Sequence, residues 1–272
     1  MRDSARLSRD DHCASANSAC TTTMKVSYYI LYSYSGHGLK SSRETIALSM
    51  NVKSFLENLI QIPAGAIKMR DDRTNTVWTE RIETFQLGRY PVTRLLYAEI
   101  MERQTPAKSE QYHPVQNVSW LEAASFCNRM SSLFDMPKYY TFDPDGGDAV
   151  SSGERVGFRL PSEAEWEFAC RAGTLGPRFG NLEDIAWYER NSGGGTRPVG
   201  LLKPNNWGLH DMLGNVWEWC DDVYDPSVYG QYRVFRGGGW ADQPRGCLAT
   251  NRRRSHPTFA IDDLGFRIAV SA

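Results

Sequence analysis

Apolar residues recur at helical spacing in two stretches of the chain, and the same capping signal precedes both. In the first stretch, Ser119 stands three residues before Glu122, so the two side chains can satisfy two amides at a helix start. The second, Ser162–Cys170 (SEAEWEFAC), repeats this serine–glutamate spacing with Glu165. The pattern predicts two amphipathic helices with their Ala, Phe, Trp, Cys and Met side chains buried.

Short apolar runs before these helices predict strands. Ile60–Met69 (IQIPAGAIKM) is typical of a strand, a Pro-Ala-Gly turn and a second strand, and Phe85–Arg89 of another strand. Thr93 is placed to cap a third helix that continues through Met101. After Arg171 the chain is rich in Gly, Pro and Asn and shows no sustained periodicity. We therefore expect an α+β fold with a large share of irregular structure.

The beginning of the chain differs from the rest. Residues 1–24 are polar and aperiodic, and residues 25–34 (KVSYYILYSY) form a short, Tyr-rich apolar run with no clean cleavage site after it. We predict a disordered or degenerate leader over residues 1–53 and one domain over residues 54–272.

Composition narrows the classes of function. The formal net charge is −1 and the isoelectric point about 6.5, which argues against a nucleic-acid or anionic-membrane partner. No apolar segment reaches the roughly 18 residues of a membrane-spanning helix. The six cysteines include no CxxC pair, which favours a reducing compartment. We expect a cytoplasmic monomer, with secretion as the alternative.

Four stretches carry distinctive motifs. They are YPVT (90–93) with PV…VSW…A…FC (114–127), FRLPSEAEWEFA (158–169), N…WGLHDMLGNVWEW (205–219), and RGGGW (236–240), closed by LGFR (264–267). In this order they resemble the formylglycine-generating enzyme, or sulfatase-modifying factor, family. The resemblance implies that family's variant of the C-type lectin fold.

The resemblance also implies a metal site. Asp211, Gly214, Val216 and Glu218 fall on positions that resemble a calcium site of the family. Two carboxylates and two backbone carbonyls are the hard oxygen ligands that Ca²⁺ prefers. The residues alone leave another interpretation open, in which Asp211 and Glu218 cap turns or pair with arginines.

The family's oxidation chemistry uses two cysteines five residues apart, which follow the RGGxW motif, bind one copper ion and exchange with a substrate cysteine. Here these positions are Asp242 and Cys247. A carboxylate takes no part in disulfide exchange, and one thiolate does not complete a two-sulfur copper site. The sequence therefore argues against copper binding and sulfatase activation. Cys247 is therefore expected to be a small packed side chain; the alternative, in which it is a nucleophile, makes it the candidate catalytic residue.

The segment 240–261 is expected to form an open face that binds a protein, a peptide or a small molecule. Aromatic and arginine side chains dominate binding hot spots. The candidate ligand-binding residues are Trp240, Asp242, Arg245, Asn251, Arg253, His256 and Phe259. Two alternatives stay open: an oxygen- or metal-dependent oxidoreductase of the same superfamily, and a variable ligand-binding protein of a diversity-generating retroelement. For at least one of the arginines we expect a structural role instead, in a pair with an acidic residue such as Glu218 or Asp262.

Overall fold

A computed structural model describes residues 49–144, 149–153 and 156–271. Most of the predicted leader lies outside these residues. The first helix of the described part is α2 (Met50–Glu57), which begins before the predicted boundary at residue 54, and the described residues belong to one compact unit. No helix in the described ranges is both long and apolar enough to cross a membrane.

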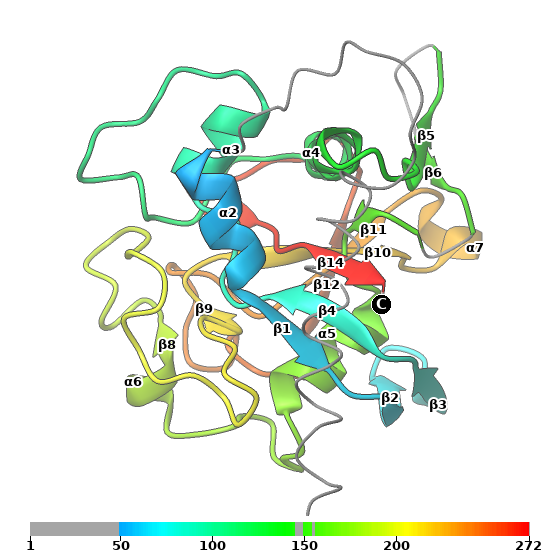
Figure 1. Cartoon of the computed structure of the whole chain (residues 1–272). Helices are drawn as coiled ribbons and strands as arrows, with labels where there is room; N and C mark the ends of the chain where they lie inside the picture. Colours follow the sequence, from blue (N-terminus) through cyan, green and yellow to red (C-terminus); the bar gives the residue numbers. More distant parts are fainter. Residues whose placement is uncertain (1–48, 145–148, 154–155, 272) are drawn as a thin grey trace, which may run out of the picture. The chain divides into compact units, whose positions relative to one another are not determined.

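Short elements joined by long irregular segments make up the fold (Figure 1). The remaining helices are α3 (Arg94–Ile100), α4 (Trp120–Leu133), α5 (Glu163–Arg171), α6 (Leu182–Ile185) and α7 (Pro226–Tyr229). The first strands are β1 (Leu59–Ile62), β2 (Gly65–Asp71), β3 (Thr76–Ile82), β4 (Phe85–Gly88), β5 (Tyr140–Phe142), β6 (Ala149–Ser151) and β7 (Phe158–Arg159). The later strands are β8 (Ala186–Trp187), β9 (Leu213–Gly214), β10 (Trp217–Val223), β11 (Arg233–Arg236), β12 (Arg252–Ser255), β13 (Leu264–Gly265) and β14 (Ala269–Ser271).

Two four-stranded sheets organise the domain. The first has the order β1-β4-β14-β7, so β14, the last strand of the described residues, lies between β4 and β7; Figure 1 shows β14 beside β4. The second has the order β12-β11-β10-β13, with β12 at one edge. The pairs β2–β3 and β5–β6 form separate hairpins, and β8 pairs with β9 in parallel. This arrangement confirms the α+β class with much irregular structure.

Local signals placed α3, α4 and α5 correctly, whereas α2, α6 and α7 were not predicted and the first residues of α2 fall in the predicted leader. Ser119 and Ser162 cap α4 and α5 with complete capping boxes, and Thr93 accepts a hydrogen bond from the Leu96 amide at the start of α3. The predicted strand–turn–strand over Ile60–Met69 is β1 and β2, but these strands pair with β4 and β3 rather than with each other. Strand β3 was not predicted, because most of its side chains are exposed and show no clear apolar alternation.

Charged residues of the family-like motifs lie in the core. Arg159, Arg236 and Arg267 are at most 1% exposed, and each pairs with a buried glutamate. Burial of an unpaired charge is very costly, so these pairs explain why such motifs contain arginine and glutamate at fixed places. The paired residues hold the loops that carry the candidate site.

Candidate functional site

The loop between β11 and β12 contains the two positions at which the family pattern has cysteines. Cys247 is 0% exposed and belongs to the main apolar core. Burial, with the charge of Asp242 as a smaller cause, raises the pKa of its thiol to about 12. Because the thiolate is the reactive form, we expect this thiol to be unreactive at neutral pH. In the described residues Cys127, Cys170, Cys220 and Cys247 are all free and buried.

The Asp242 side chain forms hydrogen bonds that stabilise the same loop. Its Oδ2 accepts a hydrogen bond from the Trp217 indole Nε1 at 2.6 Å and from the Gly239 amide at 2.9 Å. Close packing fixes the loop further: a Cβ on Gly238, whose φ is +83°, would lie 2.9 Å from the Cys247 Sγ. The carboxylate thus orders the RGGGW loop, a task that a cysteine there would not perform in the same way.

Alkylation tests this assignment of Cys247. Native protein treated with iodoacetamide and mapped by peptide mass spectrometry is expected to show no modification at Cys247, since the thiol is buried and protonated. Labelling in urea is expected to modify it fully. Rapid labelling of Cys247 in the native protein would contradict the structural role.

Several side chains gather around Asp242, and we call this group the Trp217 face, although Trp217 itself is only 2% exposed. The Arg253 guanidinium lies 5.0 Å from the centroid of the Trp217 ring, and its Nη2 is 3.7 Å from Asp242 Oδ1. The Arg253 side chain is 56% exposed, and partly exposed Trp240 donates its Nε1 hydrogen to the Asp262 carbonyl. The face therefore combines an accessible cation, Arg253, with the partly exposed ring of Trp240.

Asp263 adds a titratable group to this face. Burial and the nearby charges of Asp242 and Asp262 raise the pKa of its carboxyl to about 6, while Arg253 lowers it. Trp217 and Asp263 were missed from the sequence. Trp217 belongs to a motif interpreted as a calcium loop, and only tertiary contacts bring it beside Asp242.

The other predicted ligand-binding residues lie in separate places. Phe259 is 38% exposed on the loop after β12. The His256 Nδ1 lies 2.8 Å from the Thr258 hydroxyl oxygen, and its ring stands edge-on to Tyr232. Arg245 and Asn251 line a different hollow of about 280 Å³, where the Asn251 amide donates to the Gly246 carbonyl. Only Trp240, Asp242 and Arg253 of the predicted set meet on the Trp217 face.

The predicted calcium ligands lie around β9 and β10, and Glu218 is buried among protein donors. Its Oε2 accepts hydrogen bonds from the Trp166 Nε1 at 2.7 Å and the Arg267 Nε at 2.6 Å, and its Oε1 from the Arg267 Nη2 at 2.7 Å. Asp211 Oδ2 accepts from the Gly200 amide at 2.7 Å. Burial raises the pKa of Asp211.

These contacts test how well the set fits a calcium ion. Both oxygens of Glu218 already accept hydrogen bonds, and the Arg267 charge neutralises it. Gly214 and Val216 are buried in β9 and just after it. The carboxylate of Glu218, as placed, does not fit a calcium ligand, because the ion would have to displace an arginine. Calcium binding stays a prediction. Across the described ranges, no group of three or more His, Cys, Asp or Glu is arranged to hold a metal ion.

Comparison with known proteins follows the same motifs. Residues 47–272 match the sequence model of the sulfatase-modifying factor enzyme 1-like domain. The chain belongs to this family. Among its relatives, the inactive C-alpha-formylglycine-generating enzyme 2 of Mus musculus is 34% identical over 182 residues, 59% of this chain and 58% of that protein. The chain thus spans little more than half of the mouse protein's length. The chaperone protein LppX of Paenibacillus barcinonensis is 28% identical over 225 residues, 68% of this chain and 79% of that protein.

Solved structures agree on the fold. Treponema denticola variable protein 1 superposes with a TM-score of 0.67 and 30% identity, covering 79% of this chain and 95% of that one. PvdO from Pseudomonas aeruginosa, with 21% identity, a TM-score of 0.63 and coverage of 79% and 94%, shares the fold. The domain is a formylglycine-generating-enzyme-like variant of the C-type lectin fold, as the sequence predicted.

Proposed function

We propose that this chain is a ligand-binding member of the family, which takes a protein, peptide or small molecule on the Trp217 face and does not generate formylglycine. The observation that carries the proposal is the pair of contacts in the β11–β12 loop. Asp242 replaces a thiol and holds Trp217 and Gly239, while Cys247 is buried with its pKa raised to about 12. A site that exchanges thiols needs accessible thiolates.

The similarities support a binding role. One relative is named an inactive formylglycine-generating enzyme and another a chaperone protein, so the family includes members whose names describe no oxidation. Fold alone does not decide function, and the face itself supplies the chemistry. Arg253 offers a charged donor for a carboxylate or phosphate, and partly exposed Trp240 offers apolar surface.

A second candidate is a variable ligand-binding protein of a diversity-generating retroelement. The similarity to Treponema denticola variable protein 1 over 95% of that chain favours it. This candidate requires a near-identical template repeat beside the gene, with differences confined to adenines. A genome without such a repeat would remove it and leave the first proposal standing.

The binding proposal is tested by selection of peptides. A random peptide library is selected on the wild-type protein and counter-selected on Arg253→Ala, and the survivors are measured by calorimetry. We expect peptides whose affinity falls at least about tenfold in Arg253→Ala, which is the loss of one charge-assisted contact. Arg103→Ala, an exposed arginine beyond α3, is the matched control and should bind as the wild type does.

Two outcomes would contradict the proposal. One is a selection that yields no peptide distinguishing wild type from Arg253→Ala. The other is aldehyde formation on a cysteine peptide derived from a sulfatase when copper and oxygen are supplied, followed by mass spectrometry. The result of the peptide selection does not depend on the result of the aldehyde assay, so the two experiments test binding and catalysis separately.

A further inference from the structure

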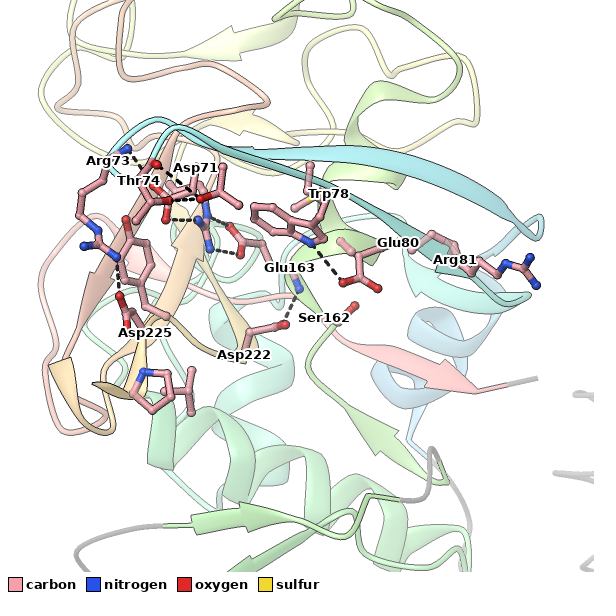
Figure 2. A pocket seen from close by; sticks show the side chains of 18 residues that line it. Asp71, Arg73, Thr74, Trp78, Glu80, Arg81, Ser162, Glu163, Asp222 and Asp225 are labelled. Atoms are coloured by element: carbon pink, nitrogen blue, oxygen red, sulfur yellow. Dashed lines mark hydrogen bonds and ion pairs between the residues drawn. The ribbon is translucent and has the colours of Figure 1, made fainter. Parts of the chain in front are cut away.

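A pocket separate from the Trp217 face lies beneath the β2–β3 hairpin, and we call it the hairpin pocket. It encloses about 480 Å³ between the hairpin, the start of α5 and the end of β10 (Figure 2). Successive side chains of β12 point to opposite faces, which separates the hairpin pocket from the Trp217 face. Arg252 lines the pocket, whereas the next residue, Arg253, lies over Trp217. A volume of this size suits a small ligand.

Beside the pocket lies a network of ion pairs in which the number of carboxylates equals the number of guanidinium groups. Three carboxylates meet three guanidinium groups in one network: Glu163 with Arg236 and Arg252, Glu167 with Arg236 and Arg171, and Asp71 with Arg252. The Arg252 side chain is 10% exposed, and all three nitrogens of its guanidinium lie 2.6 to 2.9 Å from carboxylate oxygens of Glu163 and Asp71. The Arg252 guanidinium is therefore already paired and has no free nitrogen for a further carboxylate.

Asp222 also lines the pocket, but its carboxylate is not part of this ion-pair network. Its Oδ2 accepts a hydrogen bond from the Glu163 amide at 2.6 Å, at the first residue of α5. Within the described residues it has no ion-pair partner. Burial, followed by the charges of Glu163 and Asp221, raises the pKa of its carboxyl to about 7. The negative charge of this group is therefore uncompensated inside the pocket.

The hairpin supplies a second carboxylate and an aromatic wall. The Trp78 Nε1 donates to the Glu80 Oε1 at 3.1 Å, and both line the pocket (Figure 2). The other two arginines that line the pocket, Arg73 and Arg81, are directed elsewhere. Arg73 pairs with Asp225 and lies over tyrosine rings, and Arg81 points away from Asp222 in Figure 2.

We propose that the hairpin pocket binds a small organic cation, an ammonium or guanidinium group, between Asp222 and Glu80 with the Trp78 ring as its wall. A cation there compensates the charge of Asp222, and an aromatic ring adds a favourable cation–π contact. The same group reaches the pocket as a free amine or as the end of a lysine or arginine side chain in a peptide. In the opposing interpretation, Asp222 serves only to cap α5.

Calorimetry with defined probes tests this site. The probes are agmatine for the free amine, and N-acetyl-arginine-N′-methylamide for the side chain in a peptide, each titrated into the full chain. The neutral, nearly isosteric citrulline derivative is the control ligand. We expect at least one cationic probe to bind and the citrulline derivative not to bind; which probe binds more tightly identifies the source of the cation.

Single-residue variants distinguish a role of Asp222 in cation binding from a role in capping α5. Asp222→Asn keeps an oxygen that accepts the Glu163 amide hydrogen, so the helix start is preserved while the charge is lost. We expect at least about a tenfold loss of affinity in Asp222→Asn, and a smaller loss in Glu80→Gln, because hydrogen bonds between charged groups are about twice as strong as neutral ones. Glu57→Gln, an exposed carboxylate on α2, is the matched control and should bind as the wild type does.

The affinity is expected to depend on pH. Asp222 is charged only above its pKa of about 7, so the affinity should fall by up to about tenfold per pH unit below that value and level off above it. Charged groups reach the pocket around Asp222 from every element that lines it. They are Asp221 on β10, Glu163 and Glu165 on α5, Asp71 on β2, Arg73 in the β2–β3 turn, Glu80 and Arg81 on β3, Asp225 before α7 and Arg252 on β12. Asp222→Asn should lose this dependence.

A tryptophan signal completes the test. The fluorescence change on binding should disappear in Trp78→Phe, while the heat of binding remains. The proposal is overturned if neither cationic probe binds, if the citrulline derivative binds equally well, or if Asp222→Asn binds with wild-type affinity. In each of these cases, Asp222 only caps α5.

Discussion

Replacement of Glu218 by alanine is expected to lower the free energy of unfolding by about 3 to 5 kcal/mol. Glu218 is 0% exposed, and its carboxylate is the buried counterion of Arg267. The variant leaves that guanidinium charged and unpaired, and leaves the Trp166 Nε1 without its acceptor. A loss of this size is a large part of the stability of an ordinary domain.

Urea denaturation of Glu218→Ala, with calcium and with EDTA, measures the loss and its origin. If Arg267 is the partner, the loss is the same in both solutions, and EDTA leaves the wild type unchanged. If calcium is the partner, EDTA destabilises the wild type and has no effect on the variant. Glu110→Ala, which breaks the more exposed pair with Arg94, is the control and should cost less than about 1 kcal/mol.

Local signals made the capped helices and several strands accessible from the sequence. A capping box such as Ser162 with Glu165 acts within four residues, so it is visible in the sequence and holds in the structure. Strand pairing depends on partners far along the chain. For that reason β1 and β2 were found, whereas their pairing with β4 and β3 was not.

The site shows the same division. Resemblance located Asp242 and Cys247, but the contacts that decide their roles come from Trp217 and from the core. The expectation that an arginine of the 252–254 run is structural holds for Arg252, although its partners are Glu163 and Asp71 rather than Glu218 or Asp262. A sequence shows that charges are present, and packing decides which of them meet.

The Arg236→Met variant is expected to lose about 3 to 5 kcal/mol of unfolding free energy at neutral pH. Arg236 is 0% exposed, pairs with Glu163 and Glu167, and donates to the Ala249 carbonyl at 2.6 Å. Without it, two buried glutamates share the two remaining arginines of the network. Burial of the less compensated carboxylates then raises their pKa in the folded variant above the unfolded value.

The sign of the pH effect follows from that shift. A carboxyl whose folded pKa is raised destabilises the protein where it is ionised, and the penalty shrinks as pH falls and the group takes up a proton. Urea denaturation should therefore show a larger difference between Arg236→Met and wild type at about pH 8 than at about pH 5. Arg70→Met is the matched control, because Arg70 is 64% exposed in its pair with Asp72 and should cost less than about 1 kcal/mol at either pH. A deficit in Arg236→Met no larger than in this control, or one that grows toward acid, would mean that the buried network does not depend on Arg236.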